Sequence, residues 1–300
     1  MPAEACCPIK LFADDAKVYL RVQSEADCAL LQQDLDKLYN WSVKWQLTFH
    51  PSKCTILRLG RGQPDYEYTM KDGDSRVKLN TVTIEKDLGV HIDSQLNFNH
   101  HINSIVKKAN QISGLMWRTF QFITPDIFNL LYKFMIRSHL EYAAPVWSPH
   151  SWKCATELEK VQKRATKRIP GFENIPYEER LKRLKLPTLV YRRIRGDMIN
   201  VFKYLSGHFK TKPLFTVSQD NYDTRGHNKK LQVLGAHTDR HKHTFVNRIV
   251  SWWNNLPTEV VNAPSINSFK NRFDRHFINH PMVYNYRALD CPTAPFMTVS

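Results

Sequence analysis

Two adjacent aspartates near the start of the chain, Asp14 and Asp15, are the residues best suited to chemistry. They lie between two short apolar runs, 9–13 and 17–22, that have the composition of strands. Aspartates tolerate tight turns, so the simplest prediction is a β-hairpin with the pair at its turn. Two carboxylates this close repel each other unless a cation lies nearby. Because Mg²⁺ takes carboxylate oxygens together with phosphate oxygens, the pair indicates a metal site for phosphoryl or nucleotidyl transfer.

The same pair has a second interpretation, because exposed turns often contain two aspartates that bind no metal. The surrounding elements therefore matter. A helix is expected from Ser24, as its N-cap, to Trp45, and we expect it to pack across the hairpin. Its predicted buried face consists of Leu31, Leu35, Leu38, Trp41 and Trp45. Strands are expected at 54–59, 78–84 and 87–92, with a Gly/Asp-rich loop at 71–75.

The region from about 97 to 212 is expected to be helical. Three stripes at helical spacing predict its first buried faces. They are Ile102, Ile105, Val106, Ala109, Ile112 and Met116, then Ile127, Leu130, Leu131, Phe134 and Met135, then Leu158, Val161, Ala165 and Ile169. Pro170-Gly171 is expected to end the third helix, and Pro176 and Pro187 to divide the rest into two shorter ones. After 213 we expect helices at 245–253 and 265–277, a break at Pro257, and a loosely ordered end.

The charge of the chain points to a polyanionic partner. The 43 Lys and Arg residues exceed the 28 Asp and Glu residues, which gives a net charge of +15. Residues 157–212 contain 15 basic and 6 acidic residues, a net of +9. We predict that this region binds nucleic acid through its phosphates. The candidate contacts are Lys160, Lys163, Arg164, Lys167, Arg168, Arg192, Arg193 and Arg195.

Aromatic residues in the same region allow two interpretations. Tyr177, Tyr191 and Tyr204 could stack on bases, but packing in the helical core is the favoured alternative for each. Core packing is also favoured for Trp252 and Trp253.

Cysteines and histidines give no strong metal motif. The six cysteines, including Cys291, form no CxxC pair, so free thiols in a reducing compartment are expected. His276 and His280 have a spacing that a metal could use, but a solvated helix face is favoured, and His237, His241 and His243 form no recognisable site. There is neither an apolar run of eighteen residues nor a secretory signal, so we expect an intracellular protein of the cytoplasm or nucleus without a membrane partner.

Several motifs occur in the order found in one family. Phe12-Ala13-Asp14-Asp15 followed by Ala16-Lys17-Val18-Tyr19 resembles the palm motif of reverse transcriptases from non-long-terminal-repeat, jockey-like retrotransposons. Residues 41–53 resemble the helix-then-lysine motif that closes this palm, residues 87–93 the primer-grip hairpin, and residues 97–102 the start of the thumb. Further segments resemble the helical region and the tail: 139–142, 146–147, 158–162, 177–181, 192–197, 224–227 and 253–257. The resemblance covers about residues 9–280, and the order of the motifs makes it specific.

The resemblance implies an α+β fold and an RNA-directed DNA polymerase. Its parts would be a partial palm at 1–93, a helical thumb and basic connection at 94–212, and a small helical region at 213–300. Asp14 and Asp15 would bind Mg²⁺ and position the primer 3′ end, and Lys53 would donate a proton to the leaving pyrophosphate. Leu88, Gly89 and Val90 would hold the primer. The basic helices would hold the duplex of RNA template and DNA primer.

One departure from the family limits the expected activity. Catalysis in the family also needs an earlier palm aspartate and a fingers region, both upstream of the Asp-Asp hairpin, and only eleven residues precede Phe12 here. We therefore expect a truncated polymerase fragment that binds Mg²⁺ weakly, is inactive alone, and has the amino-terminal polymerase half as its missing partner. Two alternatives remain: a nucleic-acid-binding module without chemistry, and a structural or interaction protein derived from the element.

Overall fold

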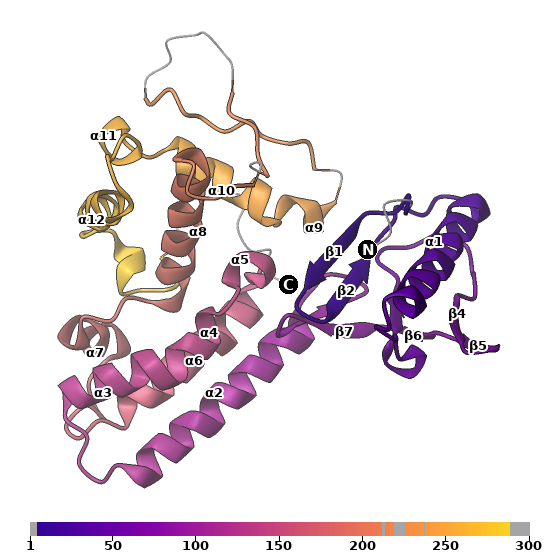
Figure 1. The fold of residues 1–300 in the computed structure, drawn as a ribbon. Coiled ribbons are helices and arrows are strands. Elements are labelled where there is room, and N and C mark those ends of the chain that lie inside the picture. The colour runs from indigo at the N-terminus through magenta and orange to yellow at the C-terminus, as the bar shows by residue number, and fades with distance from the viewer. Residues whose placement is uncertain (1–4, 212–213, 219–225, 237, 289–300) are drawn as a thin grey trace. The chain divides into compact units, whose positions relative to one another are not determined.

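The chain folds into two compact units, Met1–Leu96 and Asn97–Ser300 (Figure 1). The computed structural model describes residues 5–211, 214–218, 226–236 and 238–288. Small sheets and one long helix make up the first unit, and helices dominate the second, so the fold is α+β. Some residues named above lie outside the described ranges: Lys212, Thr224, Arg225, His237, Cys291 and the end of the chain from 289.

The first hairpin is present where the sequence predicts it. Strands β1 (Ile9–Phe12) and β2 (Asp15–Val18) pair antiparallel, with Phe12 opposite Asp15. Ala13 and Asp14 therefore form a two-residue turn, and Ala13 takes the left-handed φ of 51° that such a turn requires. We expected the second strand to extend to residue 22, but β2 ends at Val18.

The long helix of the first unit confirms its predicted start. Helix α1 (Glu25–Lys44) begins at Ser24, whose side chain and backbone form a reciprocal capping box with Asp27. Its predicted face is correct at Leu35 and Leu38, which are buried, and wrong at Trp45, which is 60% exposed. Trp45 lies just past the last helical residue, so it no longer continues the buried stripe.

Helix α1 packs on a different hairpin from the one expected. Its buried residues Cys28 and Leu35 share a core with Tyr68, Met70 and Leu79, on and beside strands β4 (Thr69–Asp72) and β5 (Ser75–Lys78). The side-chain amide of Gln32 also exchanges two hydrogen bonds with the backbone of Thr69, at 2.8 and 2.9 Å. This contact satisfies backbone groups on the edge of β4 that no neighbouring strand pairs with. In the predicted loop at 71–75, residues 73 and 74 form the turn of this hairpin, and the others belong to β4 and β5.

The remaining strands of the first unit form two further pairs. Strand β3 (Thr55–Leu57) follows the short 3₁₀ helix η1 (Pro51–Lys53) and pairs in parallel with β6 (Asn80–Val82). Strands β7 (Ile84–Asp87) and β8 (Val90–Asp93) pair antiparallel. The single strand predicted at 87–92 is wrong, because Leu88 and Gly89 have φ values of 45° and 85° and reverse the chain.

The first helices of the second unit pack side by side (Figure 1). They are α2 (Asn99–Thr119), α3 (Pro125–Leu131), the π-helix η2 (Tyr132–Arg137), α4 (Ser138–Glu141), α5 (Ala144–Trp147), α6 (Trp152–Lys167) and α7 (Tyr177–Leu184). Helix α6 ends shortly before Pro170-Gly171, and its predicted stripe from Leu158 to Ile169 is fully buried.

The predicted face of the helix running from α3 to α4 is wrong. Its buried stripe is Phe128, Tyr132, Ile136 and Leu140, each fully buried. Leu130 and Phe134 were predicted to face inward, but they are exposed, Phe134 by 74%. The segment is apolar on most sides, so spacing alone does not select a face. The π-helix also changes the number of residues per turn.

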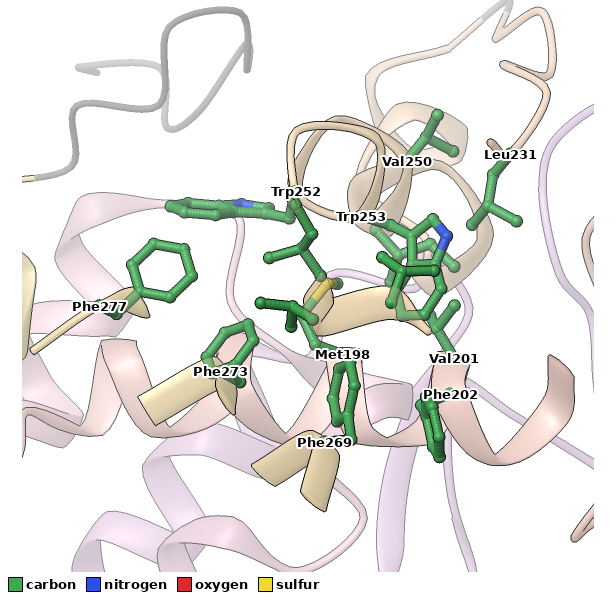
Figure 2. Close-up of a cluster of buried hydrophobic side chains, with 14 of the residues drawn as sticks. Met198, Val201, Phe202, Leu231, Val250, Trp252, Trp253, Phe269, Phe273 and Phe277 are labelled. Atoms are coloured by element: carbon green, nitrogen blue, oxygen red, sulfur yellow. The ribbon is translucent and has the colours of Figure 1, made fainter. Parts of the chain in front are cut away.

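The last helices pack on α8 (Leu189–Leu205) in one core (Figure 2). They are α10 (Phe245–Asn254), α11 (Thr258–Val261), α12 (Ile266–His276) and the 3₁₀ helix η3 (Pro281–Val283), and the short helix α9 (Asp239–Lys242) precedes α10. Trp253 is fully buried and stacks on Phe269 with ring centroids 6.0 Å apart. The predictions of core packing for Trp252, Trp253 and Tyr191 are confirmed. Phe215, Leu231 and the helices from α10 on thus share a core with α8, within the second unit.

Candidate metal and nucleic-acid sites

The two aspartates of the first hairpin are open to solvent. Asp14 lies in the turn and Asp15 begins β2, and both side chains are exposed. Among the described residues, neither carboxylate has a hydrogen bond or ion pair, and no cluster of three or more potential metal ligands occurs. Two carboxylates fit Mg²⁺, which commonly takes one or two protein ligands and completes its shell with water and phosphate oxygens. The chain can thus supply part of such a shell.

An ion pair connects this hairpin to the β7–β8 hairpin. Lys17, two residues after Asp15 in β2, binds the carboxylate of Asp87, and Asp87 directly precedes the Leu88–Gly89 turn. Figure 1 likewise shows β7 beside β1 and β2. Since both side chains are partly exposed, the pair adds little stability. It does show that the side chain of Lys17 on β2 reaches the last residue of β7.

The structure does not bring Lys53 to the aspartates. This lysine ends η1 with an exposed side chain, and within the described residues that side chain makes no hydrogen bond or ion pair. Two residues later, the hydroxyl of Thr55 donates a hydrogen bond to Glu85 of β7, at 2.8 Å. The helix η1 that carries Lys53 thus packs against β4 and β5, and the strand that follows it contacts β7.

Helix α6 presents the clearest basic surface. Lys163, Arg164, Lys167 and Arg168 are exposed along one side, opposite the buried stripe. Two of the predicted contacts are partly engaged within the chain: Lys160 pairs with Glu157 at 2.6 Å, and Arg168 lies 5.2 Å from the ring centre of Trp117. The exposed cations of this side, Lys163, Arg164, Lys167 and Arg168, are called the α6 basic face below.

The other three predicted contacts lie elsewhere. Arg192 makes a two-bond ion pair with Glu141 at 2.5 and 2.7 Å, and Arg195 makes another with Asp274 at the same distances. Arg193 is buried. None of these guanidinium groups belongs to an exposed surface that could follow a phosphate backbone, so they are not part of the nucleic-acid surface proposed below.

A buried polar network was missed by the sequence analysis. Glu159 of α6 accepts hydrogen bonds from the Tyr177 hydroxyl at 2.6 Å and the Leu189 backbone N–H at 3.0 Å. Gln162, one turn on, accepts from the Tyr132 hydroxyl at 2.6 Å and donates to Tyr177 at 3.0 Å. The network joins η2, α6, α7 and the start of α8. These polar residues do not interrupt the apolar stripe of α6. Their only signal in the sequence is their position directly beside that stripe.

Burial of Glu159 makes the stability of the second unit depend on pH. Desolvation raises the pKa of this carboxyl from 4.5 to about 7, and the hydrogen bond from Tyr177 and the charge of Arg193 oppose the rise. The folded chain thus binds a proton that the unfolded chain releases above pH 4.5. The stabilisation is complete below that pH and is lost as the pH rises toward 7, by about 2 kcal/mol between pH 5 and 7.

Glu159→Gln is expected to remove the pH dependence that Glu159 gives to the free energy of unfolding. Denaturant unfolding at pH 5, 6 and 7 should show a smaller fall in the free energy of unfolding for the variant than for the wild type. Glu157→Gln is the matched control, since this residue is partly exposed on the same helix and pairs with Lys160. An unchanged pH dependence in Glu159→Gln would contradict the assignment.

Comparison with known proteins gives a distant relative. The chain is similar to Uncharacterized protein B0403.1 of Caenorhabditis elegans, with 25% identity over 126 residues. The match covers 41% of this chain and 64% of the worm protein, just under two thirds of its length. No family model matches the chain, and no solved structure matches it. Among the described residues, no helix has the length and hydropathy needed to cross a bilayer.

Proposed function

We propose that this chain is the palm end and thumb of a retrotransposon reverse transcriptase, an RNA-directed DNA polymerase, and that it holds the primer and its template. The observation that carries the proposal is the ion pair that connects two hairpins. One turn carries Asp14 and Asp15, the other Leu88 and Gly89, and the Lys17–Asp87 ion pair connects their strands. The order of the two hairpins along the chain is the order of the motifs that the sequence resembles, and this supports the proposal.

The first turn supports the metal part of the proposal. Asp14 and Asp15 would hold Mg²⁺ by their carboxylates, and phosphate oxygens of the bound strand or nucleotide would complete the shell. The bound ion would stabilise negative charge at the reacting phosphate. The aspartates position that ion at the tip of a short hairpin, where both side chains remain open to a substrate.

The second turn supports the primer part. Gly89 has no side chain, so a strand can approach its backbone closely. Leu88 and Phe12, the last residue of β1 before the first turn, both expose apolar side chains, Phe12 by 63%. Apolar side chains at these tips can pack on a sugar or base while the carboxylates face phosphate.

The α6 basic face supports the duplex part. Contacts of lysine and arginine with phosphates fix the position of a duplex without reading its sequence. In the cell, this role places the chain wherever the RNA of the element is copied, in the cytoplasm or the nucleus. The described residues supply two carboxylates to the metal site, whereas nucleotidyl transfer between two clamped metals needs a fuller ligand set. We therefore expect weak Mg²⁺ binding and no primer extension by the isolated chain.

Iron-mediated cleavage tests the metal site. Fe²⁺ with ascorbate and peroxide should replace Mg²⁺ and cut the backbone near residues 12–16 when a primer–template is bound, and excess Mg²⁺ should suppress the cuts. Asp14→Asn with Asp15→Asn should abolish them. Asp72→Asn with Asp74→Asn is the matched control, because this pair flanks Gly73 at another exposed hairpin turn. Equal cleavage at both turns in the wild type would mean that any acidic turn suffices, and would refute the assignment.

A nucleic-acid-binding module without chemistry is the second candidate. The observation that favours it is the exposed α6 basic face, which needs no metal to bind phosphate. Such a module would bind RNA and DNA duplexes in a salt-dependent way and would show no iron cleavage at residues 12–16.

A further inference from the structure

A cavity of about 40 Å³ lies in the second unit, between α8, α10 and the loop after α5. It is larger than the roughly 10–15 Å³ that a single water molecule requires. Met198 and Trp252, labelled in Figure 2, line its apolar side. Its polar lining comprises Ser148, His150, Arg193, Asp197, His243 and Arg248.

Arg193 differs from the arginines around it. Arg192, Arg195 and Arg248 each form a two-bond ion pair with a carboxylate. Arg193 is only 6% exposed, and within the described residues its Nη1 is buried without a hydrogen-bond partner. A guanidinium is a strong donor with a fixed fork of N–H groups, so burying it without an acceptor is costly.

The acidic residues near Arg193 are already engaged. Asp197 accepts from Arg248 at 2.9 and 3.2 Å, and Glu159 accepts from Tyr177 and from the Leu189 backbone. Burial lowers the pKa of Arg193 to about 10, and the neighbouring carboxylates oppose this shift. The side chain therefore keeps its positive charge at neutral pH, and within the described residues its Nη1 has no acceptor.

Arg248 is not available as a second free donor. Besides Asp197, it binds the carbonyls of His243 at 3.3 Å and Pro145 at 2.8 Å. It thereby holds α5, which contains Pro145, and the segment before α10 against α8. The rings of His150, in the loop after α5, and His243, in the segment before α10, stack with centroids 5.5 Å apart. The cavity is thus a built site whose walls come from three elements.

We propose that this cavity binds one tetrahedral oxyanion of the phosphate class, with Arg193 as its main donor and Ser148 and His150 as further polar contacts. Donors arriving from several elements suit a tetrahedral group better than a planar carboxylate, whose acceptors lie in one plane. The ligand is either free orthophosphate or the terminal phosphate of a nucleic-acid strand. The inference goes beyond the proposed function and involves neither Asp14 nor the α6 basic face.

Orthophosphate binding to the full chain tests the proposal. Calorimetric titration should be performed against chloride at matched ionic strength. Arg193→Met should lower the affinity for orthophosphate by about tenfold or more, because a charged hydrogen-bond donor is lost. His150→Ala should lower it by a smaller factor. Lys163→Gln, on the α6 basic face, should leave it unchanged.

Several results would overturn the proposal. They are the absence of binding beyond that of chloride, or equal affinity in a folded Arg193→Met variant. If circular dichroism shows that Arg193→Met does not fold, an unchanged affinity in His150→Ala overturns it instead. Competition of 5′-phosphorylated and 5′-hydroxyl oligonucleotides with orthophosphate then distinguishes the two possible ligands. Stronger competition by the phosphorylated strand supports a strand end as ligand, and equal competition supports free phosphate.

Discussion

Replacing Lys163, Arg164 and Lys167 together by glutamine is expected to weaken nucleic-acid binding by about 100-fold near 0.15 M salt. Each lysine or arginine that neutralises a phosphate of B-DNA adds about 0.9 to the slope of log affinity against log salt, so three such contacts add nearly three units. The affinity for all sequences should fall alike, because phosphate contacts carry no base information. Lys160 and Arg168 are left out because Glu157 and Trp117 already engage them.

The measurement is a filter-binding titration of duplexes of unrelated sequence at four or more salt concentrations. The matched control replaces Lys44, Arg61 and Lys71 by glutamine, an equal change of charge in the first unit away from the two proposed hairpin turns. All three substituted residues of α6 are exposed and lie off the stripe of Leu158, Val161, Ala165 and Ile169, so the fold should survive. An unchanged slope in the α6 variant, or an equal change in the control, would show that the basic face is merely solvated.

Trp253→Ala is expected to destabilise the second unit by about 3–5 kcal/mol, the usual cost of removing a fully buried tryptophan. Its ring stacks on Phe269, and its Nε1 donates a hydrogen bond to the Lys229 carbonyl at 2.8 Å. The substitution therefore leaves a cavity among α8, α10 and α12 and also an unpaired carbonyl.

Urea unfolding followed by far-ultraviolet circular dichroism checks this prediction, since the signal comes mainly from helices. Phe122→Ala is the matched control, because this aromatic side chain is 86% exposed and its loss should change stability by about 0.5 kcal/mol or less. A similar stability for Trp253→Ala and the control would mean that α10 does not belong to the common core.

Local signals predicted the elements that position the candidate site. The turn-forming Asp14 between two short apolar runs predicted the first hairpin, and Ser24, as an N-cap residue, marked the start of α1. The stripe of α6 was correct because polar and apolar residues are cleanly separated around that helix. In each case, residues within a few positions of one another determine the structure.

Features that depend on distant partners could not be predicted. Nothing near Arg192 or Arg195 in the sequence indicates that Glu141 and Asp274 neutralise them, 51 and 79 positions away. Likewise, Phe134 and Phe128 are equally apolar, and only the neighbouring helices decide that Phe128 is buried. A net charge of +9 over 157–212 therefore overstates the basic surface available to nucleic acid.

Photo-crosslinking of a primer through its 3′-terminal nucleotide tests the central claim most directly. The two hairpin turns are proposed to hold that end, so a photoreactive base there should crosslink to residues 12–16 and to Leu88 or Gly89, as mapped by mass spectrometry. The same base placed about ten nucleotides upstream should crosslink to other parts of the chain. Crosslinks of the 3′-terminal base that map only to the second unit would contradict the assignment of the hairpins as a polymerase palm.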